Sequence, residues 1–100
     1  MVRMTESVKQ LREQLLPVLK RHGVIRAGLF GSAARGEARA GSDIDVVVEF
    51  EKGRSLFDQS GLRLDLVEIL GRAADVVTYG SLHPRLRERI LREQILIYGS

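Results

Sequence analysis

The sequence predicts an α/β (α+β) fold, in which a small mixed β-sheet is packed with helices. Three observations support this prediction. Amphipathic segments of helical length alternate along the chain with short apolar segments of strand length. The run Val46-Val47-Val48 is apolar throughout, which is typical of a strand buried on both faces. Gly23 and Gly71 each follow a helical segment, at the position where glycine commonly ends a helix.

The N-terminal third of the chain is expected to begin with a helix over residues 5–22. Its apolar side chains recur at helical spacing, and Thr5 is the expected N-cap. Pro17 lacks a backbone N–H and predicts a kink or a helix in two pieces. Beyond the helix we expect a strand, a helical turn and a loop, at residues 24–30, 32–36 and 37–42.

The remainder of the chain is expected to alternate strands and helices. The clearest strand covers residues 43–50, and a turn at 51–54 leads into a helix. That helix, residues 55–70, has the apolar positions Leu56, Phe57, Leu62, Leu66, Ile69 and Leu70. The elements expected after it are a strand, a helix and a short strand, at residues 73–78, 84–94 and 95–98.

The helix expected at residues 84–94 is basic as well as amphipathic. Ser81 or His83 is its expected cap, with Pro84 in the first turn. An apolar stripe is expected at Leu86, Ile90 and Leu91. The four arginines Arg85, Arg87, Arg89 and Arg92 form either a solvated helix face or a contact surface for an acidic partner.

Composition narrows the class of protein. A length of 100 residues predicts one domain over residues 1–100, and 44% hydrophobic residues suffice for a small core. The absence of cysteine excludes disulfides and argues against a structural zinc site. No apolar run reaches the length of a membrane span, so we expect a cytoplasmic protein without a membrane partner. A net charge of +3 does not establish nucleic-acid binding. Because aromatic residues are few and no RNA-binding motif is visible, we expect no direct nucleic-acid binding.

Gly31-Ser32 ends an apolar strand segment, and Asp43-Ile44-Asp45 opens the next one after ten intervening residues. Side chains at positions i and i+2 of a strand share a face, with Cα atoms roughly 6.5–7 Å apart. Asp43 and Asp45 can therefore converge on one hard cation. The Gly-Ser turn offers phosphates close approach, backbone N–H groups and a hydroxyl. The segment thus predicts metal ligands beside a phosphate cradle.

Asp75 is the third carboxylate that we expect at this site. It stands alone among apolar residues, in a strand predicted to pair beside the strand of Asp45. A metal ion or a reacting hydroxyl would explain a carboxylate in such a strand, whereas the alternative is an exposed Asp at the sheet edge. Asp65 competes for this role, but its position on a helix predicts that it faces solvent.

Other polar residues near the motif are open to two interpretations. Arg35 either neutralises a triphosphate or lies in solvent, and Arg39 is expected in solvent. Ser42 either donates a hydrogen bond to the nucleotide or caps the turn before the strand. His22 and His83 are isolated in the sequence and are expected in surface or capping roles.

With these residues in place, the chain resembles the DNA polymerase β-like nucleotidyltransferases, in which a GS pair precedes a DxD pair at a similar spacing. Within that superfamily it resembles the minimal nucleotidyltransferases (MNT), which are usually encoded beside a HEPN-domain partner. The resemblance covers nearly the whole chain and implies the polymerase β-like nucleotidyltransferase fold. Its motifs are Ala34-Arg35-Gly36, Ser42-Asp43-Ile44-Asp45, Ala74-Asp75-Val76-Val77 and the basic stretch at 84–91.

The resemblance implies Mg²⁺-dependent transfer of AMP from ATP to a hydroxyl group. Two Mg²⁺ ions, with Mn²⁺ as the alternative, would bind the attacking and leaving oxygens at the α-phosphate. Asp75 would face the acceptor, while the β- and γ-phosphates would lie at the Gly-Ser turn. The implied catalytic and metal-binding residues are Asp43, Asp45 and Asp75, and the nucleotide-binding residues are Gly31, Ser32, Arg35 and Ser42.

The resemblance also implies the antitoxin of a HEPN–MNT toxin–antitoxin pair. Such a type VII-like antitoxin would be a protein adenylyltransferase that modifies a tyrosine of a HEPN ribonuclease toxin within a hetero-oligomer. Two other classes stay open, a small-molecule (aminoglycoside-like) nucleotidyltransferase subunit and a non-catalytic binding antitoxin. Replacing Asp43 and Asp45 with Asn distinguishes the non-catalytic binding antitoxin from an enzyme, because a binding module would still protect against the toxin.

Overall fold

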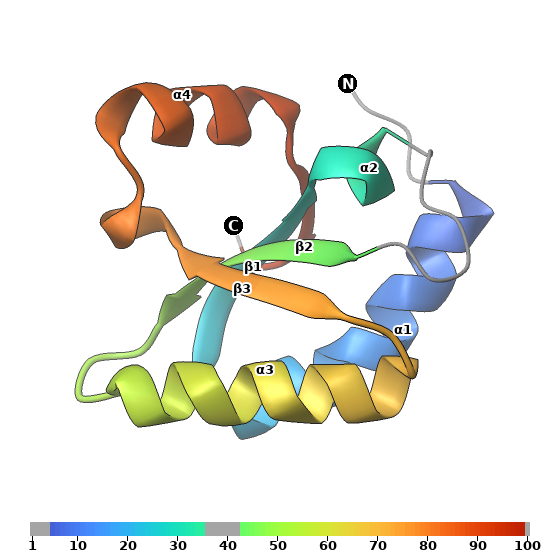
Figure 1. Cartoon of the computed structure of the whole chain (residues 1–100), viewed down its shortest axis with the longest axis horizontal. Helices are drawn as coiled ribbons and strands as arrows, with labels where there is room; N and C mark the ends of the chain where they lie inside the picture. The colour runs from blue at the N-terminus through green and yellow to red at the C-terminus, as the bar shows by residue number, and fades with distance from the viewer. Residues whose placement is uncertain (1–4, 36–42, 100) are drawn as a thin grey trace.

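The computed structural model describes residues 5–35 and 43–99 as a four-stranded mixed sheet flanked by helices (Figure 1). The strands are β1 (Val24–Phe30), β2 (Ile44–Phe50), β3 (Ala74–Thr78) and β4 (Ile95–Tyr98). The helices are α1 (Glu6–Arg21), α2 (Gly31–Ala34), α3 (Leu56–Leu70) and α4 (Pro84–Glu93), with a 3-10 helix η1 (Tyr79–Ser81). The α/β prediction is confirmed, and each predicted helix and strand begins and ends within two residues of its expected bounds. The predicted loop at 37–42 lies outside the described residues.

The sheet has the strand order β3-β2-β1-β4, with β2 in its interior. β1 pairs antiparallel with both β2 and β4, whereas β2 and β3 are parallel. A parallel pair needs a crossover, and α3 provides it between β2 and β3. As a result, β1 ends beside the residues where β2 and β3 begin, all at the same end of the strands.

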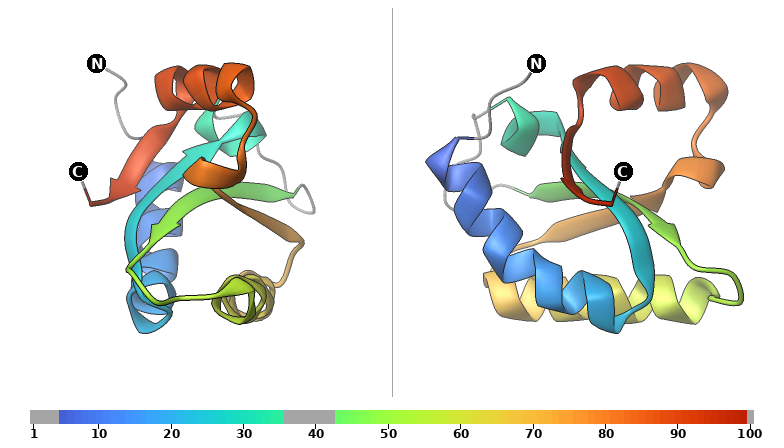
Figure 2. Two further views of the ribbon diagram at one scale, coloured as in Figure 1. Left: turned by 90° about the vertical axis from the view of Figure 1, so that its left-hand side faces the viewer. Right: turned by 180° about the vertical axis from the view of Figure 1, so that it is seen from behind.

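Helices cover the two faces of the sheet unequally. α1 and α3 pack together on one face, while α4 lies over the other (Figures 1 and 2). Val46 and Val48 belong to the main core, and Val47 belongs to a smaller buried cluster with Tyr79 and Ile90. All three valines are fully buried, which confirms the prediction of a strand covered on both faces.

Helix ends follow the predicted capping chemistry. The Thr5 hydroxyl accepts a hydrogen bond from Val8 N at 3.2 Å, and Gly71 ends α3 in the left-handed region. His83 caps α4 through Nδ1, with Pro84 as the first helical residue. The expectation of a two-piece first helix is wrong, because α1 continues through Pro17. This proline lies on the exposed side, where water can satisfy the carbonyl that lacks its usual N–H partner.

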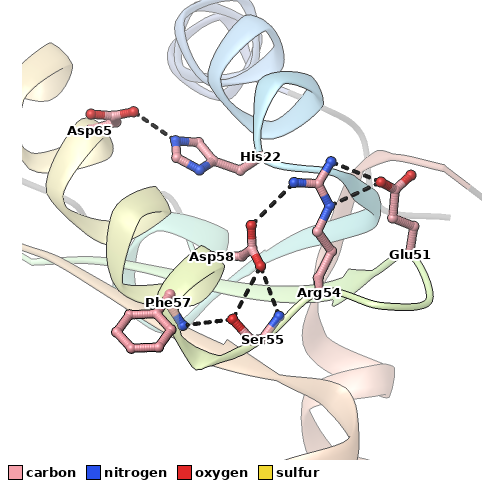
Figure 3. A network of polar contacts seen from close by, with 7 residues as sticks. All are labelled: His22, Glu51, Arg54, Ser55, Phe57, Asp58 and Asp65. Atoms are coloured by element: carbon pink, nitrogen blue, oxygen red, sulfur yellow. Dashed lines mark hydrogen bonds and ion pairs between the residues drawn. The ribbon is translucent and has the colours of Figure 1, made fainter.

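The beginning of α3 is fixed by a polar network (Figure 3). Ser55 and Asp58 form a capping box, with Ser55 N donating to Asp58 Oδ2 at 2.8 Å. Arg54 pairs with Glu51 at 2.8 Å and with Asp58 at 3.1 Å. The side chain of Phe57 points away from this network and is 89% exposed, although the sequence pattern grouped it with the apolar positions of the helix. At 3.6 residues per turn it lies opposite the buried Leu62.

A second polar pair joins α1 to α3. His22 Nε2 lies 2.6 Å from Asp65 Oδ2 (Figure 3). Arg21 Nη2 lies 3.5 Å from the same oxygen. The Asp65 side chain is 37% exposed, in line with the expectation that it faces solvent, and it also bonds to His22. His22 also has a partner, which a sequence separation of 43 residues conceals.

Each of the two outermost strands accepts a hydrogen bond from the side chain of a helix residue. Arg12 Nε of α1 donates to the Ile97 carbonyl of β4 at 2.9 Å. Gln59 Nε2 of α3 donates to the Val76 carbonyl of β3 at 3.0 Å. Among the helices that the structure describes, none is both long and apolar enough to cross a membrane.

Candidate active site

Two carboxylates and a glycine meet where β1 ends and where β2 and β3 begin. Asp45 is paired in register with Phe30, the last residue of β1, and Gly31 follows directly. On its other side Asp45 is paired in register with Asp75 across the parallel β2–β3 ladder. Residues paired in register on neighbouring strands point to the same face, and both carboxylates line a pocket together with Leu86 and Ile90 of α4. The prediction that the strand of Asp75 lies beside that of Asp45 is confirmed.

Gly31 approaches the Asp45 carboxylate closely. Its φ of +66° lies in the left-handed region, which favours glycine. A Cβ atom added at this position would collide with Asp45 Oδ2. Glycine is therefore required here both by the backbone conformation and by the space that the carboxylate occupies.

These residues line a pocket of about 390 Å³ between the sheet and α4. Its charged end contains Gly31, Arg35, Asp45 and Asp75. Its apolar end contains Val77 of β3, Leu82 after η1, and Leu86 of α4. The pocket is also lined by Phe30, Ile90, Arg89 and Glu93. Arg89 Nε and Glu93 Oε1 form an ion pair at 3.3 Å. The pocket thus joins a strongly polar region to an apolar one.

The electrostatics of the charged end disfavour the ionised form of Asp45. Partial burial raises the pKa of Asp45 above its usual 3.8, and repulsion from Asp75 and then Asp43 raises it further. The positive charge of Arg35 acts in the opposite direction. A cation or a hydrogen-bond donor at this position would stabilise the ionised carboxylate of Asp45.

The remaining predicted site residues differ in how close they lie to the pocket. Asp43 is exposed and precedes β2, but it is close enough for its charge to act on Asp45. Ser32 is half-buried in the first turn of α2 and does not line the pocket. Arg35 lies at the end of α2 and lines it. Ser42 and Arg39 lie outside the described residues.

The donor set at the charged end suits a hard divalent cation. Among the described residues, no three His, Cys, Asp or Glu side chains are arranged as a complete metal site. Mg²⁺, however, commonly binds one or two carboxylates and takes its other ligands from water and substrate phosphates. Two in-register carboxylates that repel each other, one of them lying against a glycine turn, fit that pattern.

Sequence reasoning did not identify the residues that hold α4 over the pocket. The Tyr79 hydroxyl donates to Gln94 Oε1 at 2.6 Å, joining η1 to the end of α4. The Arg26 guanidinium lies 4.7 Å from the centroid of the Tyr79 ring. Gly28 leaves space for the Gln94 side chain, since a Cβ there would collide with it. A glycine inside a strand is the signal that could have indicated this close approach.

Known proteins and a family model resemble this chain over most of its length. The model of the nucleotidyltransferase domain family matches residues 9–97. A protein of Methanocaldococcus jannaschii, named as a candidate protein adenylyltransferase, is 46% identical over 89 residues, covering 89% of this chain and 96% of the relative. The protein adenylyltransferase MntA of Thermococcus cleftensis is 37% identical over 94 residues, covering 94% of this chain and 88% of the relative.

Solved structures share the fold. One described as a candidate minimal nucleotidyltransferase has a TM-score of 0.79 and 49% identity, and covers 90% of this chain and 92% of that chain. A complex of a tri-AMPylated Shewanella oneidensis HEPN toxin with an MNT antitoxin gives a TM-score of 0.73 at 18% identity, covering 92% of this chain and 72% of that chain. At this lower identity the likeness shows the fold alone.

Proposed function

The chain belongs to the nucleotidyltransferase domain family, and from that membership we propose that it is a Mg²⁺-dependent protein adenylyltransferase. It transfers AMP from ATP to a tyrosine hydroxyl of a partner HEPN ribonuclease toxin. Modification silences the toxin, so the chain acts as the antitoxin of a type VII-like pair in the cytoplasm. The two proteins form a hetero-oligomer.

One observation carries the catalytic part of this proposal. Asp45 and Asp75 are in register at the charged end of a pocket, and Gly31 lies against Asp45. Asp43 adds a third carboxylate close enough to repel Asp45. Such a cluster has little structural use, because like charges destabilise a fold that holds them together without a counterion. Asp43, Asp45 and Asp75 are therefore the proposed catalytic and metal-binding residues.

The neighbouring turn is the proposed nucleotide site. Gly31 has no Cβ, so the Asp45 carboxylate can lie directly against this turn, and Arg35 brings a positive charge to the same pocket. The β- and γ-phosphates of ATP lie against Gly31 and Ser32, with Arg35 and Ser42 as further donors. Two divalent cations, Mg²⁺ or Mn²⁺, supply charge neutralisation and activation of the acceptor hydroxyl when bound.

The reaction is a displacement at the α-phosphate. The acceptor oxygen forms a bond to Pα while the bond from Pα to the bridging oxygen of the β-phosphate breaks, and pyrophosphate leaves. Asp75 accepts the proton of the hydroxyl, and Asp43 and Asp45 would hold the divalent cation, which would neutralise the charge of the phosphate. The strand register supports these roles, because Gly31 and Asp75 lie on opposite sides of Asp45.

The proposed partner follows from the family resemblance and from relatives named as protein adenylyltransferases. The fold shared with an MNT antitoxin in complex with an AMPylated HEPN toxin gives further support. The product of the neighbouring gene is the acceptor to test first.

Intact-mass spectrometry of this protein, ATP, Mg²⁺ and that acceptor tests the proposal. We expect one or more AMP units on the acceptor, absent without ATP and absent with Asp43→Asn/Asp45→Asn. A stable complex without any gain of mass would overturn it in favour of a non-catalytic binding antitoxin. Modification of an aminoglycoside-like small molecule, with the protein acceptor unchanged, would instead indicate a small-molecule nucleotidyltransferase subunit.

A further inference from the structure

Helix α3 has an exposed apolar stripe that neither the core nor the proposed active site uses. Its large side chains Leu56, Phe57 and Leu64 are 79%, 89% and 62% exposed. From the spacing and the charges of this stripe we propose that it binds a second copy of this chain. The two copies pair through antiparallel α3 helices that a two-fold axis relates.

The stripe lies on the opposite side of the sheet from the pocket. α3 packs with α1 on one face of the sheet, whereas the pocket lies on the other face, next to α4 (Figures 1 and 2). An acceptor bound at the pocket therefore leaves the stripe uncovered. Leu62 and Leu66 hold the inner side of α3 in the core, so the stripe stays turned outward.

The spacing of side chains along the stripe suits pairing with itself. Phe57 and Leu64 are seven residues apart, close to two helical turns, so they lie on the same side of α3. Between them, at three and four residues from each, are Ser60 and Gly61, which have small side chains. A two-fold axis at these small residues places Phe57 of one copy against Leu64 of the other. The small residues let the two helices approach closely, because the side chains at the contact set the distance between helix axes.

The two ends of the stripe have opposite charges. Glu68 follows Leu64 by four residues and is exposed on the same side of α3. Lys52 is exposed in the turn that leads into the helix. Within the described part of the chain neither has an ion-pair partner, whereas Arg54 of the same turn is already paired with two carboxylates.

These charges favour the antiparallel order of the two helices. An antiparallel pair brings Glu68 of one copy to the turn that contains Lys52 of the other, and the two-fold axis repeats this contact at the far end. A parallel pair would instead bring like charges together at both ends. The stripe is therefore complementary to itself in charge as well as in shape.

One pair of helices makes a small interface. Three large apolar side chains per copy fall well short of the roughly 20–30 residues per side that a standard interface uses. We therefore expect a dimer that forms at high protein concentration and dissociates on dilution. Both pockets stay open in this dimer, because each lies on the side of its sheet away from α3.

Sedimentation equilibrium of the full chain, without ATP or acceptor, measures the association from about 10 µM to about 1 mM. We expect the average mass to rise with concentration toward that of two chains. Phe57→Ser should raise the dissociation constant at least about tenfold, because it removes an aromatic anchor from both halves of the interface. Leu91→Ser, at an exposed leucine of α4, is the matched control and should equal the wild type. A monomer at every concentration, or equal dissociation constants for the two variants, would overturn the proposal.

Charge reversal tests the antiparallel order. Lys52→Glu and Glu68→Lys each set like charges together at both ends of the pair, and each should raise the dissociation constant about threefold or more at low salt. An equimolar mixture of the two variants restores opposite charges at both ends of the mixed dimer. We expect this mixture to associate more tightly than either variant alone. A mixture that associates no better than its components would overturn the antiparallel pairing.

The association can be tested separately from the proposed function. Its measurements contain no nucleotide, so their outcome does not depend on whether AMP is transferred. In the transfer assay Phe57→Ser should match the wild type, because α3 lies away from the carboxylates of the pocket. A loss of transfer in this variant, at dilutions where the wild type is a monomer, would assign the stripe to the acceptor and overturn the proposal.

Discussion

Asp45 and Asp75 are paired in register on adjacent parallel strands, although 30 positions separate them in the sequence. The crossover through α3 brings them together, and partial burial and mutual repulsion raise the pKa of Asp45. The metal-free protein therefore keeps an unfavourable charge arrangement that a bound cation would relieve.

Replacing Asp45 with Asn is expected to lower AMP transfer by at least about a hundredfold, because it removes a proposed ligand of the divalent cation that neutralises the reacting phosphate. The same change should leave the metal-free protein at least as stable as the wild type at pH 7, because repulsion with Asp75 and Asp43 disappears. Calorimetry and the transfer assay measure the two effects. Glu49→Gln, an exposed position on the same strand, is the control and should change neither.

The pH dependence of stability follows from the same group. A carboxyl pKa raised above 3.8 means that the folded state holds the proton more tightly than the unfolded chain. The metal-free protein should therefore lose stability as pH rises through the raised pKa of Asp45. The slope in this window should be smaller for Asp45→Asn, and equal slopes would refute the assignment.

Gly31→Ala and Gly71→Ala form a matched pair of backbone changes. Both glycines have φ of +66°, so each alanine should cost about 1–2 kcal/mol of stability. Around Gly71 an added Cβ meets nothing within 4 Å, whereas at Gly31 it collides with Asp45 Oδ2. We expect only Gly31→Ala to lose transfer activity. Equal activity of the two variants would show that this close approach does not matter to catalysis.

Tyr79→Phe removes the hydrogen bond that joins η1 to the end of α4. Its loss leaves Gln94 Oε1 without the Tyr79 donor and should cost about 1 kcal/mol, or roughly 4–8 °C in Tm. Tyr98→Phe is the control, because the described structure gives its hydroxyl no hydrogen bond and its ring lies against Lys20. Thermal unfolding of both variants checks the prediction, which fails if the two lose the same stability.

Asp65→Asn tests the pair that links α1 and α3. The hydrogen bond to His22, followed by the charges of His22 and Arg21, holds the pKa of Asp65 below 3.8. A lowered carboxyl pKa stabilises the fold above 3.8, and this contribution is lost as pH falls through the lowered value. Acid unfolding of Asp65→Asn should begin from lower stability and show a flatter slope there. Glu68→Gln, one turn along the same helix face, should follow the wild type.

Local sequence patterns predicted the elements and much of the charged end of the site. Asp75 could be assigned beside Asp45 because a lone carboxylate in an apolar strand is unusual and only a few pairings were open to that strand. The pair His22–Asp65 and the bond Tyr79–Gln94 could not be predicted, since each depends on how separate elements pack. Helical periodicity alone identifies apolar positions but not which of them the sheet covers. Phe57 and Leu91 both fit the apolar periodicity of their helices, yet their side chains are exposed in the fold.

The hydrogen bonds from Arg12 to Ile97 and from Gln59 to Val76 have a consequence for behaviour at high concentration. An outermost strand with open carbonyls can recruit a strand from another molecule and start ordered aggregation. Here each outer strand already has one of its acceptors occupied by a long side chain from a helix packed beside it. An incoming chain would first have to displace that side chain. Arg12 and Gln59 therefore close part of each open edge of the sheet to such pairing.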